Sequence, residues 1–198
     1  MSKLKKKAGF TLMEMLIVVA IIAVLVAIAI PVFNGSLEKS RQAVDAANAR
    51  SLKALLATMV MDGQVDFTGG SDKVTGFWVL VTRDSTVRPE TYEKSMQGTM
   101  FCGGDAGVKI YGETSGSWNR ENEAFRKVVE NSIGVLDSKS GGGNQGWDWY
   151  LVEYVYNKED DTQECFVYSG KNNGKSGYDE IKNSLKTNAL AKYMEGRK

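Results

Sequence analysis

The stretch Gly9-Phe10-Thr11-Leu12-Met13-Glu14, which runs directly into an apolar segment at 15–33, decides how this chain is organised. Four lysines precede it, at positions 3, 5, 6 and 7, and no acidic residue comes before Glu14. The apolar segment contains no charged side chain. A helix over 10–31 would be about 33 Å long at ~1.5 Å per residue, which matches a hydrocarbon core of ~30 Å. The stretch therefore predicts one membrane-spanning helix.

The lysine cluster predicts how this helix is inserted. Basic residues beside a span stay on the cytoplasmic side, so the N-terminus is expected in the cytoplasm and the remainder outside. A cleaved secretory signal is the competing interpretation, because it also begins with basic and then apolar residues. Its apolar core would be shorter, and Pro31-Val32-Phe33-Asn34 is not a small-x-small cleavage site. We therefore expect the helix to stay in the mature protein.

Glu14 is the one acidic residue in this region. A charged group inside a membrane span costs ~2.5–3.5 kcal/mol, so it usually marks a partner or a function. Its place near the membrane boundary also allows the side chain to reach the polar surface without any partner. The residues alone leave both interpretations open.

The pattern Gly9-Phe10-Thr11-Leu12-x-Glu14, between a short lysine-rich leader and a long apolar helix, resembles the prepilin signal of type IV pilins and pilin-like pseudopilins. The resemblance covers roughly residues 1–60. It implies that a prepilin peptidase cuts between Gly9 and Phe10 and that Phe10 is then N-methylated. It also implies that Glu14 pairs with the amino terminus of a neighbouring subunit during assembly. A carboxylate in a low-dielectric bundle gains most from such a cation.

Two positions further along the helix bear on its behaviour in a filament. Pro31 falls where the family often carries proline. Ala23 stands where many relatives have a glycine that helps the helix to unwind. The resemblance therefore implies local melting around 23–31, and Ala23 makes that inference less direct.

Behind the span we expect an amphipathic continuation of the helix and then a head. The predicted division is a leader at 1–9 that is removed, a transmembrane and assembly helix at 10–33, its amphipathic continuation at 34–62 and an extracytoplasmic head at 63–198. Apolar residues recur at mostly three- and four-residue steps with charged residues, Asp45 among them, between them; they are Phe33, Leu37, Val44, Ala47, Leu52, Leu55, Met59 and Val60. The helix is expected to end at Asp62-Gly63.

The head is predicted to be a modest antiparallel sheet laid on this helix, which makes the fold class α+β and pilin-like. Alternating or apolar runs predict strands at 76–82, 108–111, 147–156 and 165–168, the last two joined as a hairpin through the acidic segment 157–164. Short helices are expected at 119–131 and 178–195. Glycine-bearing loops or turns are expected at 63–71, 102–105 and 141–146.

Composition argues against enzymes. The 198 residues suit one domain plus an anchor, and 25 Lys and Arg against 24 Asp and Glu leave almost no net charge. There is no histidine, so the commonest general base, the commonest metal ligand and every Ser–His or Cys–His pair are missing. No catalytic residue, cofactor or metal is expected.

Candidate chemistry in the head is sparse. Cys102 and Cys165 suit an oxidising exterior and either form a disulfide or remain two buried free thiols. The loop from Ser169 to Ser176 lacks the phosphate-loop spacing, and the acidic run 159–161 is interpreted as a hairpin tip. A lysine and tyrosine patch is a candidate nucleic-acid contact, with a solvated face as the simpler interpretation; it comprises Lys171, Lys175, Lys182, Lys186, Tyr168 and Tyr178.

The resemblance implies the function. We expect a structural type IV pilus subunit, held in the cell membrane as a precursor and then displayed in an extracellular filament for adhesion, motility or surface interaction. Implied partners are further copies and other pilins, a prepilin peptidase, an assembly platform protein and a cytoplasmic ATPase. A pseudopilin of a type II secretion or competence DNA-uptake system is the alternative. A signal-anchored ectodomain acting alone, as an enzyme or receptor, would have no use for the Gly9–Phe10 junction.

Overall fold

A computed structural model describes residues 10–70, 72–83, 98–116, 120–141 and 146–171, together with Leu190 and Met194. The chain divides into two compact units, Met1–Lys39 and Ser40–Lys198. The first helix, α1 (Leu12–Met61), contributes to both units. Each unit is described by itself below.

In the first unit α1 is continuous through Pro31. Its side chains are exposed almost throughout, including the apolar residues between Leu12 and Phe33. The predicted helix is therefore present. The local melting expected at 23–31 is not seen in this structure, where those residues are helical.

In the second unit α1 packs on the head through a stripe that differs from the predicted one. Its buried residues are Gln42, Asp45, Ala46, Ala49, Leu52, Leu56 and Met59. Val44 and Ala47, predicted to face the core, are exposed instead. The spacing of apolar residues placed Asp45 on the charged face, whereas the structure buries it with hydrogen-bond partners of its own.

The end of α1 confirms the predicted stop. The N–H of Gly63 donates to the carbonyl of Val60 at 3.0 Å, and that of Gln64 donates to the carbonyl of Met59 at 2.9 Å. These two bonds are those of a Schellman motif. Gly63 has a φ of +68°, a left-handed conformation that glycine adopts without steric cost.

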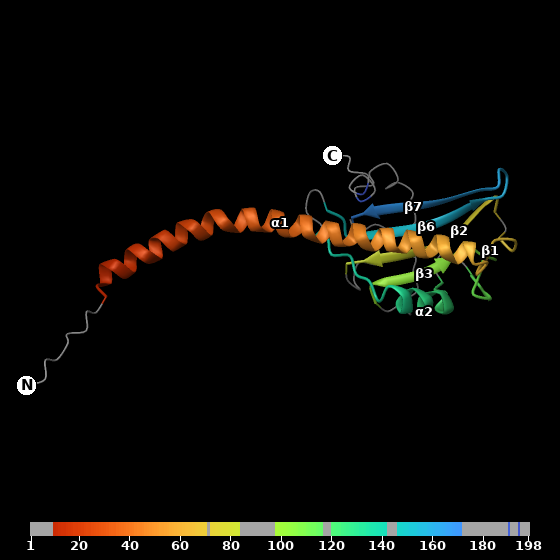
Figure 1. The fold of residues 1–198 in the computed structure, drawn as a ribbon, viewed down its shortest axis with the longest axis horizontal. Helices are drawn as coiled ribbons and strands as arrows, with labels where there is room; N and C mark the ends of the chain where they lie inside the picture. Colours follow the sequence, from red (N-terminus) through yellow and green to blue (C-terminus); the bar gives the residue numbers. More distant parts are fainter. Residues whose placement is uncertain are drawn as a thin grey trace, which may run out of the picture. The chain divides into compact units, whose positions relative to one another are not determined.

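A four-stranded antiparallel sheet in the order β3-β2-β6-β7 forms the centre of the head, with α1 crossing one of its faces (Figure 1). The strands are β2 (Val74–Thr82), β3 (Met100–Gly104), β6 (Trp149–Asn157) and β7 (Thr162–Gly170). Residues 158–161 turn β6 into β7, so that Asn157 pairs with Thr162. The predicted hairpin and the predicted α+β class are confirmed.

Three further strands form a small second sheet in the order β1-β4-β5. They are β1 (Val65–Asp66), β4 (Lys109–Ile110) and β5 (Glu113–Thr114). Only β4 was predicted as a strand. The expected turn at 102–105 is also wrong, because residues 102–104 belong to β3 and pair with β2.

Both faces of the main sheet are apolar. One face packs against α1 and contributes Phe77, Val79 and Val81 to the main core. The other carries a second cluster of Trp78, Leu80, Phe101, Trp149 and Leu151. The rings of Trp78 and Trp149 lie over Gly103 and Gly170, where a Cβ would collide with them. These two glycines are therefore required by close packing across strands.

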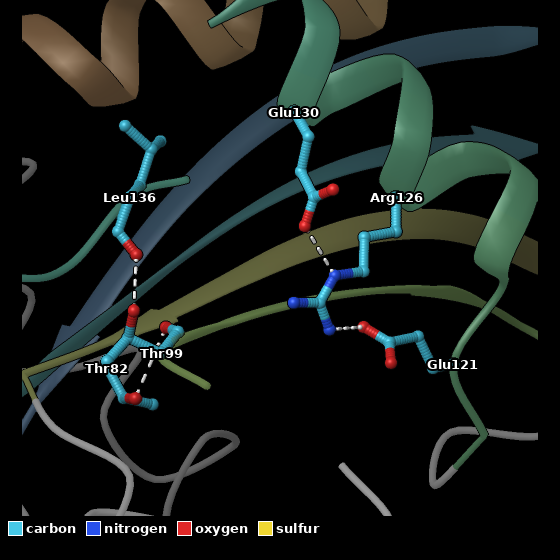
Figure 2. A network of polar contacts seen from close by, with 6 residues as sticks. All are labelled: Thr82, Thr99, Glu121, Arg126, Glu130 and Leu136. Carbon is cyan, nitrogen blue, oxygen red and sulfur yellow. Dashed lines mark hydrogen bonds and ion pairs between the residues drawn. The ribbon is translucent and has the colours of Figure 1, made fainter. Parts of the chain in front are cut away.

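A second helix, α2 (Glu123–Ser132), packs beside β3. The Asn122 side chain accepts from the N–H of Phe125 at 2.9 Å and caps the helix, which explains why it begins later than predicted. Figure 2 shows Arg126 between Glu121 and Glu130, at 2.9 and 2.7 Å. The helix predicted at 178–195 lies outside the described residues, apart from Leu190 and Met194, which are both helical.

Candidate functional site

Thr11 and Glu14 form a reciprocal hydrogen-bonded unit at the start of α1. The backbone N–H and the hydroxyl of Thr11 donate to Oε2 of Glu14 at 2.8 and 2.9 Å. The N–H of Glu14 points back to Oγ1 of Thr11 at 3.3 Å. This is a capping box, in which two otherwise unsatisfied donors of the helix terminus find acceptors. Glu14 therefore has a local structural role besides any role in assembly.

The helix that follows this cap is apolar on every side. Its large side chains between Leu12 and Phe33 are all about half exposed or more within this chain. Among the described residues, α1 is the one helix whose length and composition would let it cross a membrane. A helix that is apolar all round is stable only inside a membrane or inside a bundle. This surface must therefore be covered by lipid or by other protein.

The family comparison matches this part of the chain. Residues 4–30 match the model described as the prokaryotic N-terminal methylation motif. The chain carries a prepilin-type N-terminus. The match includes Gly9, Phe10 and Glu14 and confirms the resemblance drawn from the sequence.

Curated relatives are fimbrial and secretion proteins. The chain is 39% identical over 85 residues to a fimbrial protein of Dichelobacter nodosus, covering 39% of this chain and 53% of the relative. It is 37% identical over 93 residues to a type IV major fimbrial protein FimA of the same organism, covering 43% and 58%. It is 31% identical over 94 residues to the type II secretion system core protein G of Vibrio cholerae, covering 48% and 62%.

These alignments are partial. The chain spans between about half and three fifths of the length of the relatives just described. No solved structure matches the chain. The prepilin-type N-terminus is thus established, together with a partial similarity to fimbrial and secretion proteins, and what the whole protein does is a matter for proposal.

The structure describes some of the predicted N-terminal site residues and not others. Gly9 lies outside the described residues, so the geometry of the Gly9–Phe10 junction is not described. Phe10 is 80% exposed and precedes the capped helix. Thr11 was not singled out from the sequence, although its position three residues before Glu14 is the signature of a capping box.

The disulfide considered between Cys102 and Cys165 is not formed. Both thiols are free, and they lie on β3 and β7, at opposite edges of the sheet. Three strand spacings of ~4.8 Å separate these edges by roughly 14 Å, whereas a disulfide needs Cα atoms about 4.4–6.8 Å apart. Burial raises the pKa of both thiols, that of Cys165 to about 11. Both are therefore protonated, unreactive core side chains at neutral pH.

Asp45 is a buried carboxylate that joins α1 to the segment before β6. Its Oδ2 accepts from Oγ of Ser138, the N–H of Ser140 and Nε1 of Trp147, at 3.0, 3.1 and 2.8 Å. Its Oδ1 accepts from the N–H of Lys139 at 2.7 Å. Burial raises the pKa of Asp45, and the four donors oppose this shift. The group fastens residues 138–140 and Trp147 to the helix.

Glu153 is a second carboxylate with an altered environment. It lies on β6, between Trp78 on β2 and Phe166 on β7. Burial, followed by the nearby charge of Asp105, raises its pKa to about 7, while a hydrogen bond with Tyr168 acts in the opposite direction. The folded protein thus holds a proton on Glu153 that the unfolded chain releases at lower pH.

Glu153 is expected to make the head less stable as the pH rises. An unfolded glutamate titrates near pH ~4.3, so its contribution is fully present below that pH and is lost through about pH 7. The loss is at most about 4 kcal/mol, because each unit of pKa shift is worth ~1.36 kcal/mol. Glu153→Gln should be only slightly more stable than the parent at pH 5 and clearly more stable at pH 8.5. Urea unfolding of the full chain in detergent at both pH values measures this.

Glu164→Gln is the matched control for this prediction, because Glu164 lies exposed on the neighbouring strand. It should unfold with the same pH dependence as the parent chain. A difference between parent and Glu153→Gln that is equal at pH 5 and pH 8.5 would contradict the titration of Glu153.

The remaining candidates from the sequence are only partly described. Tyr168 is half-buried on β7, and Lys171 follows that strand. The other members of the proposed nucleic-acid patch lie outside the described residues: Lys175, Tyr178, Lys182 and Lys186. In the acidic turn, Asp160 accepts from the N–H and hydroxyl of Thr162, so this carboxylate shapes the hairpin tip.

Proposed function

We propose that this chain is a structural subunit of a type IV pilus, polymerised through its N-terminal helix. The observation that carries the proposal is the match of residues 4–30 to the N-terminal methylation motif, continuous with a helix that exposes apolar side chains on every side. Such a surface needs lipid before assembly and other helices after it. The fimbrial relatives support the same conclusion.

In this proposal the chain exists in two states, first as a membrane precursor and then as a filament subunit. As a precursor it crosses the cell membrane once, with the lysine-rich leader in the cytoplasm. After cleavage between Gly9 and Phe10 and methylation of Phe10, it enters an extracellular filament, and Glu14 pairs with the amino terminus of a neighbouring subunit. Its partners are further copies and other pilins, a prepilin peptidase, an assembly platform protein and an ATPase. The role is mechanical and not catalytic.

Leader removal is the first prediction of this proposal. The mature chain is expected to lack residues 1–9 and to begin with a methylated Phe10. Intact mass and N-terminal sequencing of the membrane-associated protein measure both changes. Gly9→Val should block cleavage, because a β-branched side chain then occupies the junction. An uncleaved parent chain in cells with an active prepilin peptidase would contradict the proposal.

A pseudopilin of a type II secretion or DNA-uptake system is the second candidate, and the similarity to the core protein G is the observation that favours it. The two candidates differ in whether the polymer extends from the cell surface or stays within the cell envelope. Electron microscopy and mass spectrometry of sheared surface material should find long filaments containing this chain if it is a pilus subunit. A chain that stays in the cell envelope, with secretion or uptake failing when it is deleted, would favour the pseudopilin.

A further inference from the structure

The head contains an open pocket that none of the proposed functions uses. It has a volume of about 590 Å³ and lies beside β1, the residues after it and the end of β6. Its lining residues are Val65, Asp66, Phe67, Thr68, Tyr156 and Lys158. Pockets for small ligands usually measure ~300–1,000 Å³. The volume therefore suits a small molecule.

Aromatic rings form the apolar part of the pocket. The ring centroids of Phe67 and Tyr156 are 5.3 Å apart. Phe67 is only 8% exposed and packs into the core, whereas Tyr156 is partly exposed. The Tyr156 hydroxyl donates to Asp161 at 2.9 Å, which fixes the position of the ring. A fixed aromatic ring can pack against the C–H groups of a ligand at little cost in conformational entropy.

The polar groups of the pocket are held in place and carry opposite charges. Oδ1 of Asp66 accepts from the N–H and the hydroxyl of Thr68 at 2.8 and 2.6 Å, which leaves Oδ2 to accept from a ligand. These bonds lower the pKa of Asp66, so the group is ionised at neutral pH. Nζ of Lys158 donates to the carbonyl of Gly70 at 2.5 Å, and its other two protons can be donated to a ligand.

This combination selects against charged ligands. Asp66 repels an anion, and Lys158 repels a cation, as does Lys109, whose charge acts on Asp66 from the paired strand. A neutral ligand with several hydroxyl groups can donate to the carboxylate and accept from the ammonium, and such charge-assisted bonds are strong. The aromatic ring demands, in addition, an apolar face on the same ligand.

We propose that this pocket binds a neutral pyranose sugar, whose C–H face packs on Tyr156 and whose hydroxyl groups bond to Asp66 and Lys158. A sugar ring carries both an apolar face and neutral hydroxyls, which are the two features that the lining requires. The proposal depends only on the head and stands whether or not the chain forms filaments.

Saturation-transfer NMR on the purified full chain tests the proposal, in a phosphocholine detergent because maltoside detergents carry sugars. The ligands are the methyl glycosides of glucose, galactose and mannose, with glucuronate and glucosamine as anionic and cationic comparators at pH 6. At least one neutral glycoside should bind saturably at millimolar concentration, and the charged comparators at least fivefold more weakly. No saturable neutral binding, or tighter binding of a charged comparator, would overturn the proposal.

Variants locate the binding. Asp66→Asn keeps the oxygen that accepts from Thr68 but loses the charge, and should weaken binding about tenfold. Tyr156→Ala should abolish binding, whereas Tyr156→Phe should keep it within about twofold because the ring remains. Asp62→Asn and Lys127→Gln, exposed residues outside the pocket, are the matched controls and should bind as the parent does.

If Asp66→Asn, Tyr156→Phe and Tyr156→Ala all bound the sugar as tightly as the parent, the sugar would bind elsewhere and the site would be refuted. Thermal unfolding of each variant separates lost binding from lost folding, and Asp66→Asn is conservative enough to stay folded. Comparing each free hexose with its methyl glycoside distinguishes two sources of the same chemistry. Tighter binding of the free hexose indicates a soluble sugar, and tighter binding of the glycoside indicates the end of a glycan.

Discussion

Glu14→Gln is expected to leave leader removal intact and to lower filament yield at least about tenfold. The glutamine oxygen can still accept from Thr11, and a capping box functions with either residue. Only the negative charge is lost. A charge in a membrane span costs ~2.5–3.5 kcal/mol, so a cation pairing that offsets this cost is of similar size. Each ~1.4 kcal/mol of lost pairing energy lowers the assembly equilibrium tenfold. Immunoblots of sheared filaments against total subunit measure the yield.

Thr11→Ala is the complementary variant, because it removes the hydroxyl of the cap and keeps the carboxylate. Loss of a cap costs about 1 kcal/mol of helix stability, so filament yield should fall only modestly. Equal losses from Thr11→Ala and Glu14→Gln would mean that the cap, and not the charge, is what assembly needs. A normal yield from Glu14→Gln would remove the proposed pairing altogether.

The parts of the fold that the sequence predicted are those with strong local signals. The start and the end of α1 follow from the apolar segment and from Asp62-Gly63. Strands β2 and β6 are runs of aromatic and β-branched residues, and the β6–β7 turn is marked by polar residues at 157–164. Each of these signals acts over a few neighbouring residues.

Strand β3 was missed because its residues have no local reason to form a strand. Cys102-Gly103-Gly104 resembles a turn in isolation. The structure shows that Gly103 is required because the Trp78 ring of the adjacent strand lies over it. The disulfide prediction was wrong for a similar reason, because the distance between Cys102 and Cys165 depends on strand order and not on local sequence. Strand order is set by contacts between distant segments.

The N-terminal motif was predictable because its residues are contiguous in the chain, from Gly9 to Glu14, and the family match confirms that the motif is present. The pocket around Asp66 and Tyr156 could not be predicted in this way. Its two walls are about 90 residues apart in sequence and belong to different sheets, β1 to the small sheet and β6 to the main one. Asp45 was misplaced for a related reason, because its burial depends on donors that lie beyond α2.

Asp45→Ala is expected to destabilise the head by about 3–5 kcal/mol. It leaves four donors without their acceptor, three of them buried, on Ser138, Ser140 and Trp147, and one partly buried, the N–H of Lys139. One unsatisfied buried donor costs about 1–3 kcal/mol. The individual costs do not add fully, because the segment can relax. For a domain of this size the melting temperature should fall by roughly 10 °C. Near-ultraviolet circular dichroism of the full chain in detergent measures the melting temperature.

Asp45→Asn should give an intermediate loss, which a simple loss of packing would not. Its carbonyl oxygen can take the place of Oδ2 and keep three donors, while its NH₂ group then meets the N–H of Lys139 and loses only that bond. Asp62→Ala, exposed near the end of the same helix, should stay within about 0.5 kcal/mol of the parent. If Asp45→Ala unfolded like Asp62→Ala, residues 138–140 and Trp147 would not depend on the helix. An ordered loss, alanine greater than asparagine greater than parent, identifies this carboxylate as the acceptor that holds the segment to α1.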